Sequence, residues 1–304
     1  MWSRRSLLSA FAAGAATAGM APLPAPARRS RLILLGTKGG PTPSAFRAPA
    51  ASVLIVDDIP YVIDCPDGVA RQLVLAGVDL TTLGGLFITH HHSDHMAGLG
   101  SLLLLSWGAG LKRAITAFGP PPISRIVRAE LDSGASDIEA RIREEGRPPL
   151  GQLITARSLR GRQLVLPGPP ARVTCAPVDH YTVPALAYRF DTPDRSFVFS
   201  GDTAPSRGLV ELAAGADVLV HEAMLVAGLD RLKDGNAPSL RDHLLKSHTT
   251  TEQLGQVAAA AGVRTVVLTH LVPAFPDISD AVWAEGVRKH FRGEIIVGRD
   301  LMEI

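Results

Sequence analysis

The chain has 304 residues, of which 46% are hydrophobic and 20% are charged. This composition is typical of a globular protein with a large core, and the length allows one large α/β domain or two small ones. The formal net charge is only +2, with 31 Lys and Arg against 29 Asp and Glu. Because nucleic-acid-binding proteins neutralise phosphates with a basic excess, this balance argues against a bulky RNA substrate.

The first 27 residues are expected to be an export signal outside the fold. Arg4 and Arg5 precede a mildly apolar run, which resembles a twin-arginine signal, and residues 25–27 or 18–21 offer small residues for cleavage. The run, at residues 7–21, is shorter than the roughly 20 residues that cross a bilayer. Removal of residues 1–27 leaves 29 basic against 29 acidic residues. We therefore expect the domain of residues 28–304 to reach the periplasm, or another extracytoplasmic site, through the twin-arginine translocase.

Hydrophobic periodicity predicts a strand-rich first part and a second part in which strands and helices alternate. In the first part, strands are predicted at 32–35, 52–56, 61–64, 85–89 and 114–117, and helical segments at 69–76, 95–106 and 123–146. Strands then follow at 163–166, 172–177, 185–190 and 196–199. Beyond them, helices are predicted at 207–214, 250–261 and 281–291, and strands at 218–220, 265–268 and 295–297. Residues 120–122 and 146–151 are predicted to be turns within the domain.

The most informative segment ends the strand predicted at 85–89. His90, His92, Asp94 and His95 place four metal donors within six positions. Side chains two apart in an extended segment share a face, so His90 and His92 can bind one ion together. If a helix begins at His95, Asp94 and His95 can reach a second ion. Imidazole and carboxylate at this density suit zinc or a similar divalent transition metal.

This spacing resembles the metallo-β-lactamase superfamily, whose signature is His-x-His-x-Asp-His at the end of a strand. The resemblance extends over residues 31–304, and the later motifs follow the order of the ribonuclease Z and arylsulfatase-like branch. Those motifs are His180, 200–203, 221–223, 247–250 and 269–271, while residues 35–41 and 61–68 upstream resemble the family's opening strand and its Asp-bearing third strand. The resemblance implies a single-domain, four-layer αββα sandwich, in which two sheets pack face to face between outer helices.

The resemblance also implies a centre of two divalent metal ions, most simply Zn²⁺. The first ion would be held by His90, His92 and His180, the second by Asp94, His95 and His270, and both by a bridging Asp202. Donors at the ends of several strands can converge in this way. A hydroxide that bridges the ions is the expected nucleophile, because two ions lower the pKa of a shared water to near neutrality.

Further side chains are expected to assist the chemistry. Asp94 is expected to orient the nucleophile as well as to bind metal, and Asp64 to fix the ring of a metal-bound histidine. In the ribonuclease Z branch, residues matching Glu222 and His248 form a pair that helps to protonate the leaving oxygen. Two alternatives stay open: Asp64 is a turn residue, or residues 249–251 only cap a helix and His248 is incidental.

The remaining histidines are expected to have no direct role in the site. His91 alternates away from its neighbours and is expected to pack behind the loop, while His221 precedes Glu222 at a strand end. His243 and His290 lie in charged helical stretches and are predicted to be solvated.

Two cysteines and two aromatic residues are assigned to the core. Cys65 and Cys175 are too few for a disulfide framework, and a buried thiol is preferred to a metal ligand at Cys65. Trp107 and Phe118 are also expected in the core, with a pocket-lining role as the alternative.

The preferred hypothesis is an exported dinuclear hydrolase of a small anionic ester, either a phosphodiester or a sulfate ester. The alternative is a ribonuclease Z-like endonuclease or phosphodiesterase on RNA. Only 22 positions separate His180 from Asp202. That interval cannot hold the long Gly/Pro-rich arm with which bacterial ribonuclease Z clamps tRNA, so nucleic acid is disfavoured and the arm-free arylsulfatase-like proteins are the closer analogy.

Three other classes are weighed. A lactonase or β-lactamase-like hydrolase is disfavoured, because the acid formed by Glu222 and His248 benefits stable alkoxide leaving groups most. A di-iron oxidoreductase on this scaffold usually has Glu in place of His92. A non-catalytic metal-binding protein would not need the complete set of donors. The sequence is compatible with a homodimer.

Overall fold

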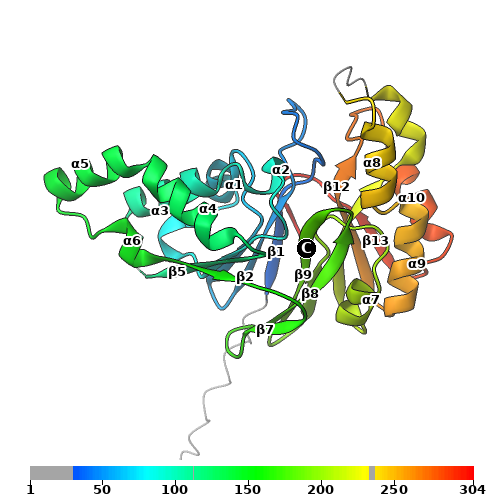
Figure 1. Cartoon of the computed structure of the whole chain (residues 1–304). Helices are drawn as coiled ribbons and strands as arrows, with labels where there is room; N and C mark the ends of the chain where they lie inside the picture. Colours follow the sequence, from blue (N-terminus) through cyan, green and yellow to red (C-terminus); the bar gives the residue numbers. More distant parts are fainter. Residues whose placement is uncertain (1–29, 112, 233–236) are drawn as a thin grey trace, which may run out of the picture.

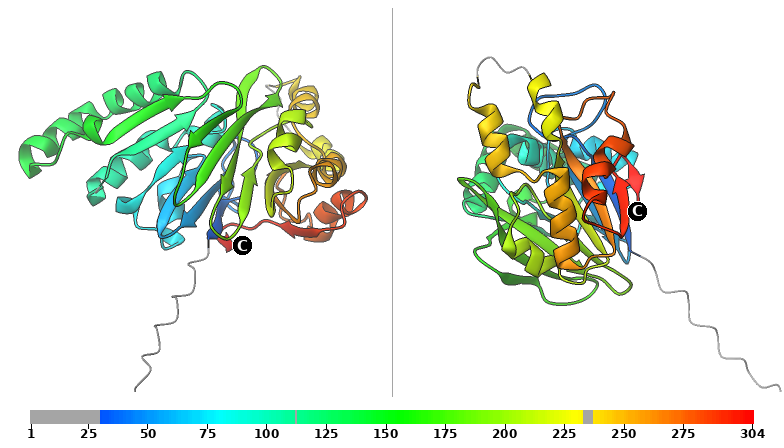
Figure 2. Two further views of the ribbon diagram at one scale, coloured as in Figure 1. Left: turned by 90° about the horizontal axis from the view of Figure 1, so that it is seen from below. Right: turned by 90° about the vertical axis from the view of Figure 1, so that its right-hand side faces the viewer.

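The computed structural model describes residues 30–111, 113–232 and 237–304. Two seven-stranded mixed sheets pack face to face, and helices cover the outer face of each sheet (Figures 1 and 2). This arrangement confirms the predicted four-layer sandwich. The predicted export signal at residues 1–27 lies outside the described residues. It stays a prediction, which the N-terminal sequence of the mature protein would decide.

The first sheet combines the N-terminal strands with the last strand of the chain. In order across the sheet, the strands are β14 (Met302–Glu303), β1 (Arg31–Gly36), β2 (Ala51–Val56), β3 (Ile59–Ile63), β4 (Gly85–Phe87), β5 (Ile115–Gly119) and β6 (Ile154–Ser158). Its outer face is covered by α1 (Val69–Leu75), α3 (Leu99–Ala109) and α4 (Ile123–Ser133), with η1 (Leu80–Thr82) beside them. Helices α5 (Ala135–Glu145) and α6 (Leu150–Leu153) extend to the left in Figure 1.

The second sheet is built from the rest of the chain. In order across the sheet, the strands are β13 (Glu294–Val297), β12 (Thr265–Val272), β11 (Val218–Met224), β10 (Ser196–Phe199), β9 (Val183–Asp191), β8 (Arg172–His180) and β7 (Gln163–Leu166). Its outer face is covered by α7 (Arg207–Ala213), α9 (Thr251–Ala261) and α10 (Asp280–Arg288). The segment between β11 and α9 contains η2 (Val226–Arg231) and α8 (Leu240–Ser247).

Alternation along the strands explains why the sheets have two buried faces. In β1, Leu32 and Leu34 belong to the core between the sheets, whereas Ile33 and Leu35 pack against the helices. Successive side chains in a strand point to opposite faces, so a strand that is apolar on both faces needs a layer on each side. The continuous apolar runs in the sequence therefore specify internal strands of a layered fold.

Aromatic rings fill the centre of the layer between the sheets. The rings of Tyr61, Phe118, Tyr188 and Phe190 surround Phe87, with centroids 4.9 to 6.1 Å from its own. The predicted core role of Phe118 is therefore confirmed. So is that of Trp107, which is buried among the helices of the first sheet and donates a hydrogen bond to the carbonyl of Pro148. Neither ring lines the cavity beside Asp202 and His270, so the pocket-lining alternative is not supported.

Several strands end at the same edge of the sandwich. Strand β8 is antiparallel to β9, which is antiparallel to β10, and β10, β11 and β12 are parallel to one another. The carboxyl ends of β8, β10, β11 and β12 therefore lie together, and loops there can bring residues from distant parts of the chain into one site.

Some predicted elements differ from the structure. The helix predicted at 95–106 is interrupted, because Gly98 separates α2 (Ser93–Met96) from α3, and a Cβ there would collide with the carbonyl of Pro66. Gly134 likewise divides the predicted segment 123–146 into α4 and α5. The short helix α6 begins at Leu150, inside a predicted turn, and the periodicity indicated neither β6 nor α8. No helix of the described residues is long and apolar enough to cross a bilayer.

Two helical glycines predict opposite effects of the same substitution. A Cβ at Gly255 in α9 would lie 2.5 Å from the carbonyl oxygen of Val287 in α10, whereas a Cβ at Gly108 in α3 would meet no atom within 4 Å. We expect Gly255→Ala to lower the free energy of unfolding by about 1–3 kcal/mol. Gly108→Ala should raise it by about 0.5–1 kcal/mol. Urea denaturation measures both; equal changes would contradict the close contact of α9 and α10.

Candidate metal centre

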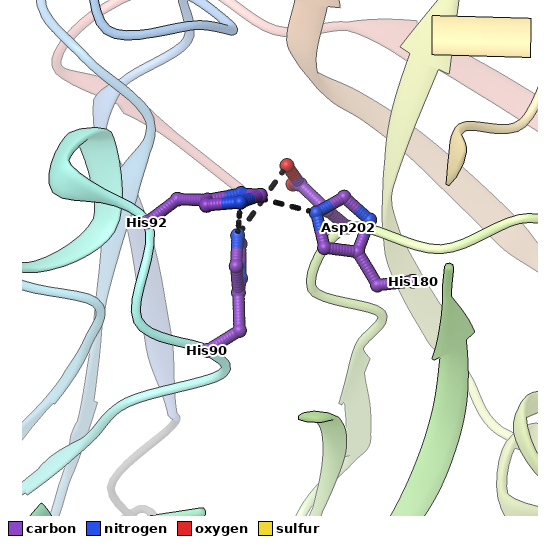
Figure 3. Close-up of side chains that lie close together, drawn as sticks. All are labelled: His90, His92, His180 and Asp202. Atoms are coloured by element: carbon purple, nitrogen blue, oxygen red, sulfur yellow. Dashed lines mark hydrogen bonds and ion pairs between the residues drawn. The ribbon is translucent and has the colours of Figure 1, made fainter. Parts of the chain in front are cut away.

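The histidine-rich segment after β4 lies where the two sheets meet. His90, His92 and His180 come together with Asp202, one donor atom from each lying within 4.8 Å of the others (Figure 3). Nδ1 of His92 lies 3.0 Å from Nε2 of His90 and 3.1 Å from Nε2 of His180. Segments 88 positions apart in the sequence thus present three ring nitrogens to one point.

A second group of donors adjoins the first. The donor atoms of Asp94, His95 and His270 also lie within 4.8 Å of one another. Oδ2 of Asp202 is 3.3 Å from Nε2 of His95 and 3.3 Å from Nε2 of His270, and it is 3.8 Å from Nε2 of His90. Asp202 therefore stands between the two groups, in the position expected of a bridging ligand. All seven predicted side chains converge, while their role as ligands stays a prediction.

Hydrogen bonds fix the orientation of the rings from behind. Asp64 accepts hydrogen bonds from the backbone N–H of Thr89 at 2.8 Å and from its hydroxyl at 2.9 Å. The same carboxylate lies 2.8 Å from Nδ1 of His95, so Nε2 of that ring points at the site. Nδ1 of His180 is held 3.0 Å from the carbonyl oxygen of Ser247. Metal-binding histidines commonly use their second nitrogen in this way, which is the role predicted for Asp64.

The donor set fits divalent cations. Three imidazole nitrogens converge on one point, and Oδ1 of Asp202 is buried with no hydrogen-bond donor among the described residues. Burial of a carboxylate oxygen without a partner is unfavourable, and a cation at this point would satisfy Oδ1. Imidazole and carboxylate together suit zinc and similar metals.

The charges of the site favour neutral rings at His90 and His180, an ionised carboxylate at Asp202 and a positive charge at His95. Burial holds the pKa of His90 well below its ordinary value and that of His180 at about 4, so both rings are neutral. Burial opposes a charge on Asp202, but His270 and His95 outweigh it and keep the pKa of that carboxyl well below its usual range. Burial likewise opposes a charge on His95, yet Asp202 and Asp64 raise its pKa well above the ordinary value. The carboxylates thus attract positive charge to this point.

Two backbone irregularities aim Asp202 and His270. Gly201 has φ of 60°, and a Cβ there would lie 2.8 Å from Cβ of Thr89. Only glycine fits this close turn easily. On β12, the pairing with β11 shifts register so that His270 is the extra residue of a β-bulge, with φ of 42°. A bulge redirects a side chain, and here it turns His270 toward the site.

Glu222 and His248 form the predicted pair beside the donors. Nδ1 of His248 lies 2.9 and 3.0 Å from the two carboxylate oxygens of Glu222, and 4.0 Å from Oδ2 of Asp202. Although burial disfavours a charged ring, Glu222 outweighs it and raises the pKa of His248 to about 9. Thr250 caps α9 through a capping box with Gln253. Thr250 therefore caps the helix while His248 pairs with Glu222, and the catalytic role of His248 stays a prediction.

The other histidines are placed as expected with one exception. His91 is half-buried, His221 is buried, with Nδ1 2.7 Å from the carbonyl oxygen of Glu222, and His290 is exposed. The prediction for His243 was wrong. It is half-buried, and its ring centroid lies 6.3 Å from that of His248. The proximity of His243 to the site depends on α8, and the sequence gives no strong signal for that helix.

Cys65 is buried and belongs to the apolar core of the first sheet, and burial raises the pKa of its thiol well above the ordinary value. Cys65 belongs to neither group of converging donors, so its interpretation as a buried thiol is confirmed.

Comparison with known proteins decides the family. A model of the β-lactamase superfamily domain matches residues 61–271. The chain belongs to the metallo-β-lactamase superfamily. Ribonuclease Z of Mycobacterium bovis (strain BCG / Pasteur 1173P2) is 31% identical over 282 residues, which cover 90% of this chain and 97% of the relative.

Solved structures of superfamily members share the fold. Human tRNase Z, short form, has a TM-score of 0.66 and 21% identity, covering 90% of this chain and 98% of its own. Zn²⁺-bound PqqB from Methylobacterium extorquens has a TM-score of 0.62 and 14% identity, covering 90% of this chain and 99% of its own. Membership and the donor set together identify a metal-dependent hydrolase that binds divalent ions.

The position of Asp64 predicts a measurable loss of metal affinity. Asp64→Asn keeps the shape of the side chain but removes the charge that holds His95, so we expect metal binding to weaken about 10- to 100-fold. Asp67→Asn, an exposed substitution on the same loop, is the matched control. Competition with a chromogenic chelator measures the affinities. Equal affinity in the two variants would show that Asp64 is only a turn residue.

Proposed function

We propose that this metallo-β-lactamase superfamily member is a phosphodiesterase of the ribonuclease Z type that hydrolyses RNA phosphodiesters. The observation that carries the proposal is the buried Glu222–His248 pair, with His248 4.0 Å from Asp202. The alignment with a protein named ribonuclease Z over 97% of that protein's length supports it.

Divalent ions held by the two donor groups, for which Zn²⁺ suits the ligands best, would supply an activated water and stabilise negative charge on the phosphate. The chain's own residues then have distinct tasks. Asp202 and Asp94 provide fixed negative charge at the centre. His95 is kept in one orientation by Asp64, so its free nitrogen stays aimed at the site.

His248 is placed to supply a proton to the leaving oxygen. Glu222 occupies its Nδ1, so Nε2 is the nitrogen that can donate. With its pKa raised to about 9, the ring carries that proton at neutral pH. The backbone N–H of Thr203 donates to Glu222 at 2.7 Å, which fixes the carboxylate. The ribose alkoxide released from RNA is a poor leaving group, so an acid in this position suits the cleavage of RNA phosphodiesters.

From the sequence alone, the short interval between His180 and Asp202 argues against RNA. The proposed function does not depend on an arm in that interval. In the structure, β8 and β9 join through a two-residue turn, so an arm has no place there. The alignment with the mycobacterial ribonuclease Z runs over 282 residues that span 90% of this chain and 97% of the relative. An alignment that spans nearly all of both chains supports a shared architecture and, with it, the proposed function.

A small anionic ester is the second candidate substrate. The near-equal number of basic and acidic residues favours it, because a long RNA normally binds through a basic surface. A short phosphodiester or a sulfate ester would need only the site itself. Export through the twin-arginine route, if the N-terminal segment is removed, would also bring the protein to such substrates.

A substrate panel decides between these functions. We expect the metal-loaded protein to hydrolyse bis(p-nitrophenyl) phosphate and a short single-stranded RNA, with little turnover of p-nitrophenyl sulfate or nitrocefin. Turnover is followed by absorbance and by gel electrophoresis of the RNA. Cleavage of the small phosphodiester without cleavage of RNA would select the second candidate. Full metal occupancy without phosphodiester turnover would reject the proposal.

Variants of His248 and Asp202 should separate the acid from the metal centre. We expect His248→Ala to slow RNA cleavage about 10²- to 10⁴-fold, while esters with a p-nitrophenolate leaving group lose little. Its metal content should equal that of the unaltered protein. Asp202→Ala should lose both metal and activity on every substrate. Metal analysis by mass spectrometry beside the rates tests this, and equal metal loss in both variants would contradict the division of roles.

A further inference from the structure

A row of aromatic rings leads from the donor groups to the surface. The ring centroid of His243 lies 6.4 Å from those of His92 and His180, and 6.3 Å from that of His248. The ring of Tyr181 lies a further 6.4 Å beyond His243. Tyr181 is 62% exposed, so the row ends on an aromatic side chain that is open to solvent beside the site.

The backbone places Tyr181 at an unusual position. His180 pairs with Val183 across the β8–β9 turn, which leaves Tyr181 and Thr182 as the two turn residues. Tyr181 has φ of 52°, whereas glycine is preferred at a first central position with positive φ. A bulky side chain is unfavourable in this region, and such positions concentrate at functional sites. The fold gains no core packing in return, because the ring is exposed.

A positive charge lies next to this ring. Lys246 is three residues after His243 on α8, so the two side chains share a face of the helix. Its Nζ lies 5.8 Å from the centroid of the Tyr181 ring. An exposed aromatic face beside an ammonium group, one ring away from the metal centre, matches a nucleobase with a phosphate attached.

We propose that Tyr181 stacks on the base of the nucleotide next to the scissile phosphate, and that Lys246 binds a phosphate of the same substrate. This inference rests on the proposed phosphodiesterase function and assigns its substrate class: esters of nucleotides, rather than phosphodiesters that lack a base. Tyr181 is thereby a specificity-determining residue, and His243 forms the wall between it and the donors.

Two esters with the same leaving group test the stacking. They are uridine 3′-(p-nitrophenyl phosphate) and methyl p-nitrophenyl phosphate, which differ in the presence of a nucleoside. Tyr181→Gly should raise KM for the uridine ester about 5- to 100-fold, the range for loss of one stacked base. KM for the methyl ester should change less than about twofold, since no base is involved. Tyr181→Phe keeps the ring and should retain both values.

Stability measurements keep the test independent of folding. Because glycine accepts a positive φ, Tyr181→Gly should unfold at the same temperature or higher than the unaltered protein. Leu245→Ala, on the same helix as Lys246 and also exposed, is the control for unspecific effects on α8. An equal rise of KM for both esters, or no rise for either, would overturn the proposed stacking.

Binding measurements separate this inference from the proposed function. By calorimetry, uridine 5′-monophosphate should bind more tightly than ribose 5-phosphate, and Tyr181→Gly should remove the difference. Lys246→Ala should weaken both ligands alike, whereas Arg241→Ala removes a charge from α8 beside Asp230 and should weaken neither. If neither ester is hydrolysed, the proposed function fails, and the two ligands still test base recognition. Equal binding of the ligands to the unaltered protein would refute it.

Discussion

One buried carboxylate connects all parts of the site. Oδ2 of Asp202 lies between 3.3 and 4.0 Å from ring nitrogens of four histidines, which come from the segment after β4, from β12 and from the end of α8. A charge in this position is unfavourable unless it is compensated from several sides. The imidazoles around Asp202 therefore allow a charged group to be buried between the two sheets.

The fold meets this condition through strand direction and local irregularity. Parallel strands of the second sheet deliver Asp202, Glu222 and His270 to one edge, and the segment after β4 delivers the histidine cluster from the opposite sheet. Regular strands alone would point alternate side chains away from the centre. The turn at Gly201 and the bulge at His270 correct the direction, so the chemistry depends on two places where regular geometry is abandoned.

Prediction from sequence succeeded where the signal was local or ordered along the chain. The spacing of His90, His92, Asp94 and His95 indicated two groups of donors, and the order of later motifs added the distant ones. The layer order came from the resemblance to the superfamily, and the strands that are apolar on both faces agree with it. The bulge at His270 has no recognisable residue pattern, because it arises from the register between two strands. His243 was missed since α8 is only 8 residues long and mostly polar.

The near-neutral net charge and the short interval between His180 and Asp202 favour a small ester as substrate, whereas the relatives favour RNA. The net charge describes the whole protein, whereas a hydrolytic site recognises only the substrate groups that touch it. The absent arm likewise counts only against relatives that possess one.

The hydrogen bond between His180 and the backbone of Ser247 has a further consequence. Ser247 ends α8, and the next residue is His248, so one short helix end anchors a ring on one side and presents the proton donor on the other. Any sliding of that helix end disturbs both at once. A substitution that shifts the end of α8 would therefore act on the proposed acid and on the proposed metal ligand together.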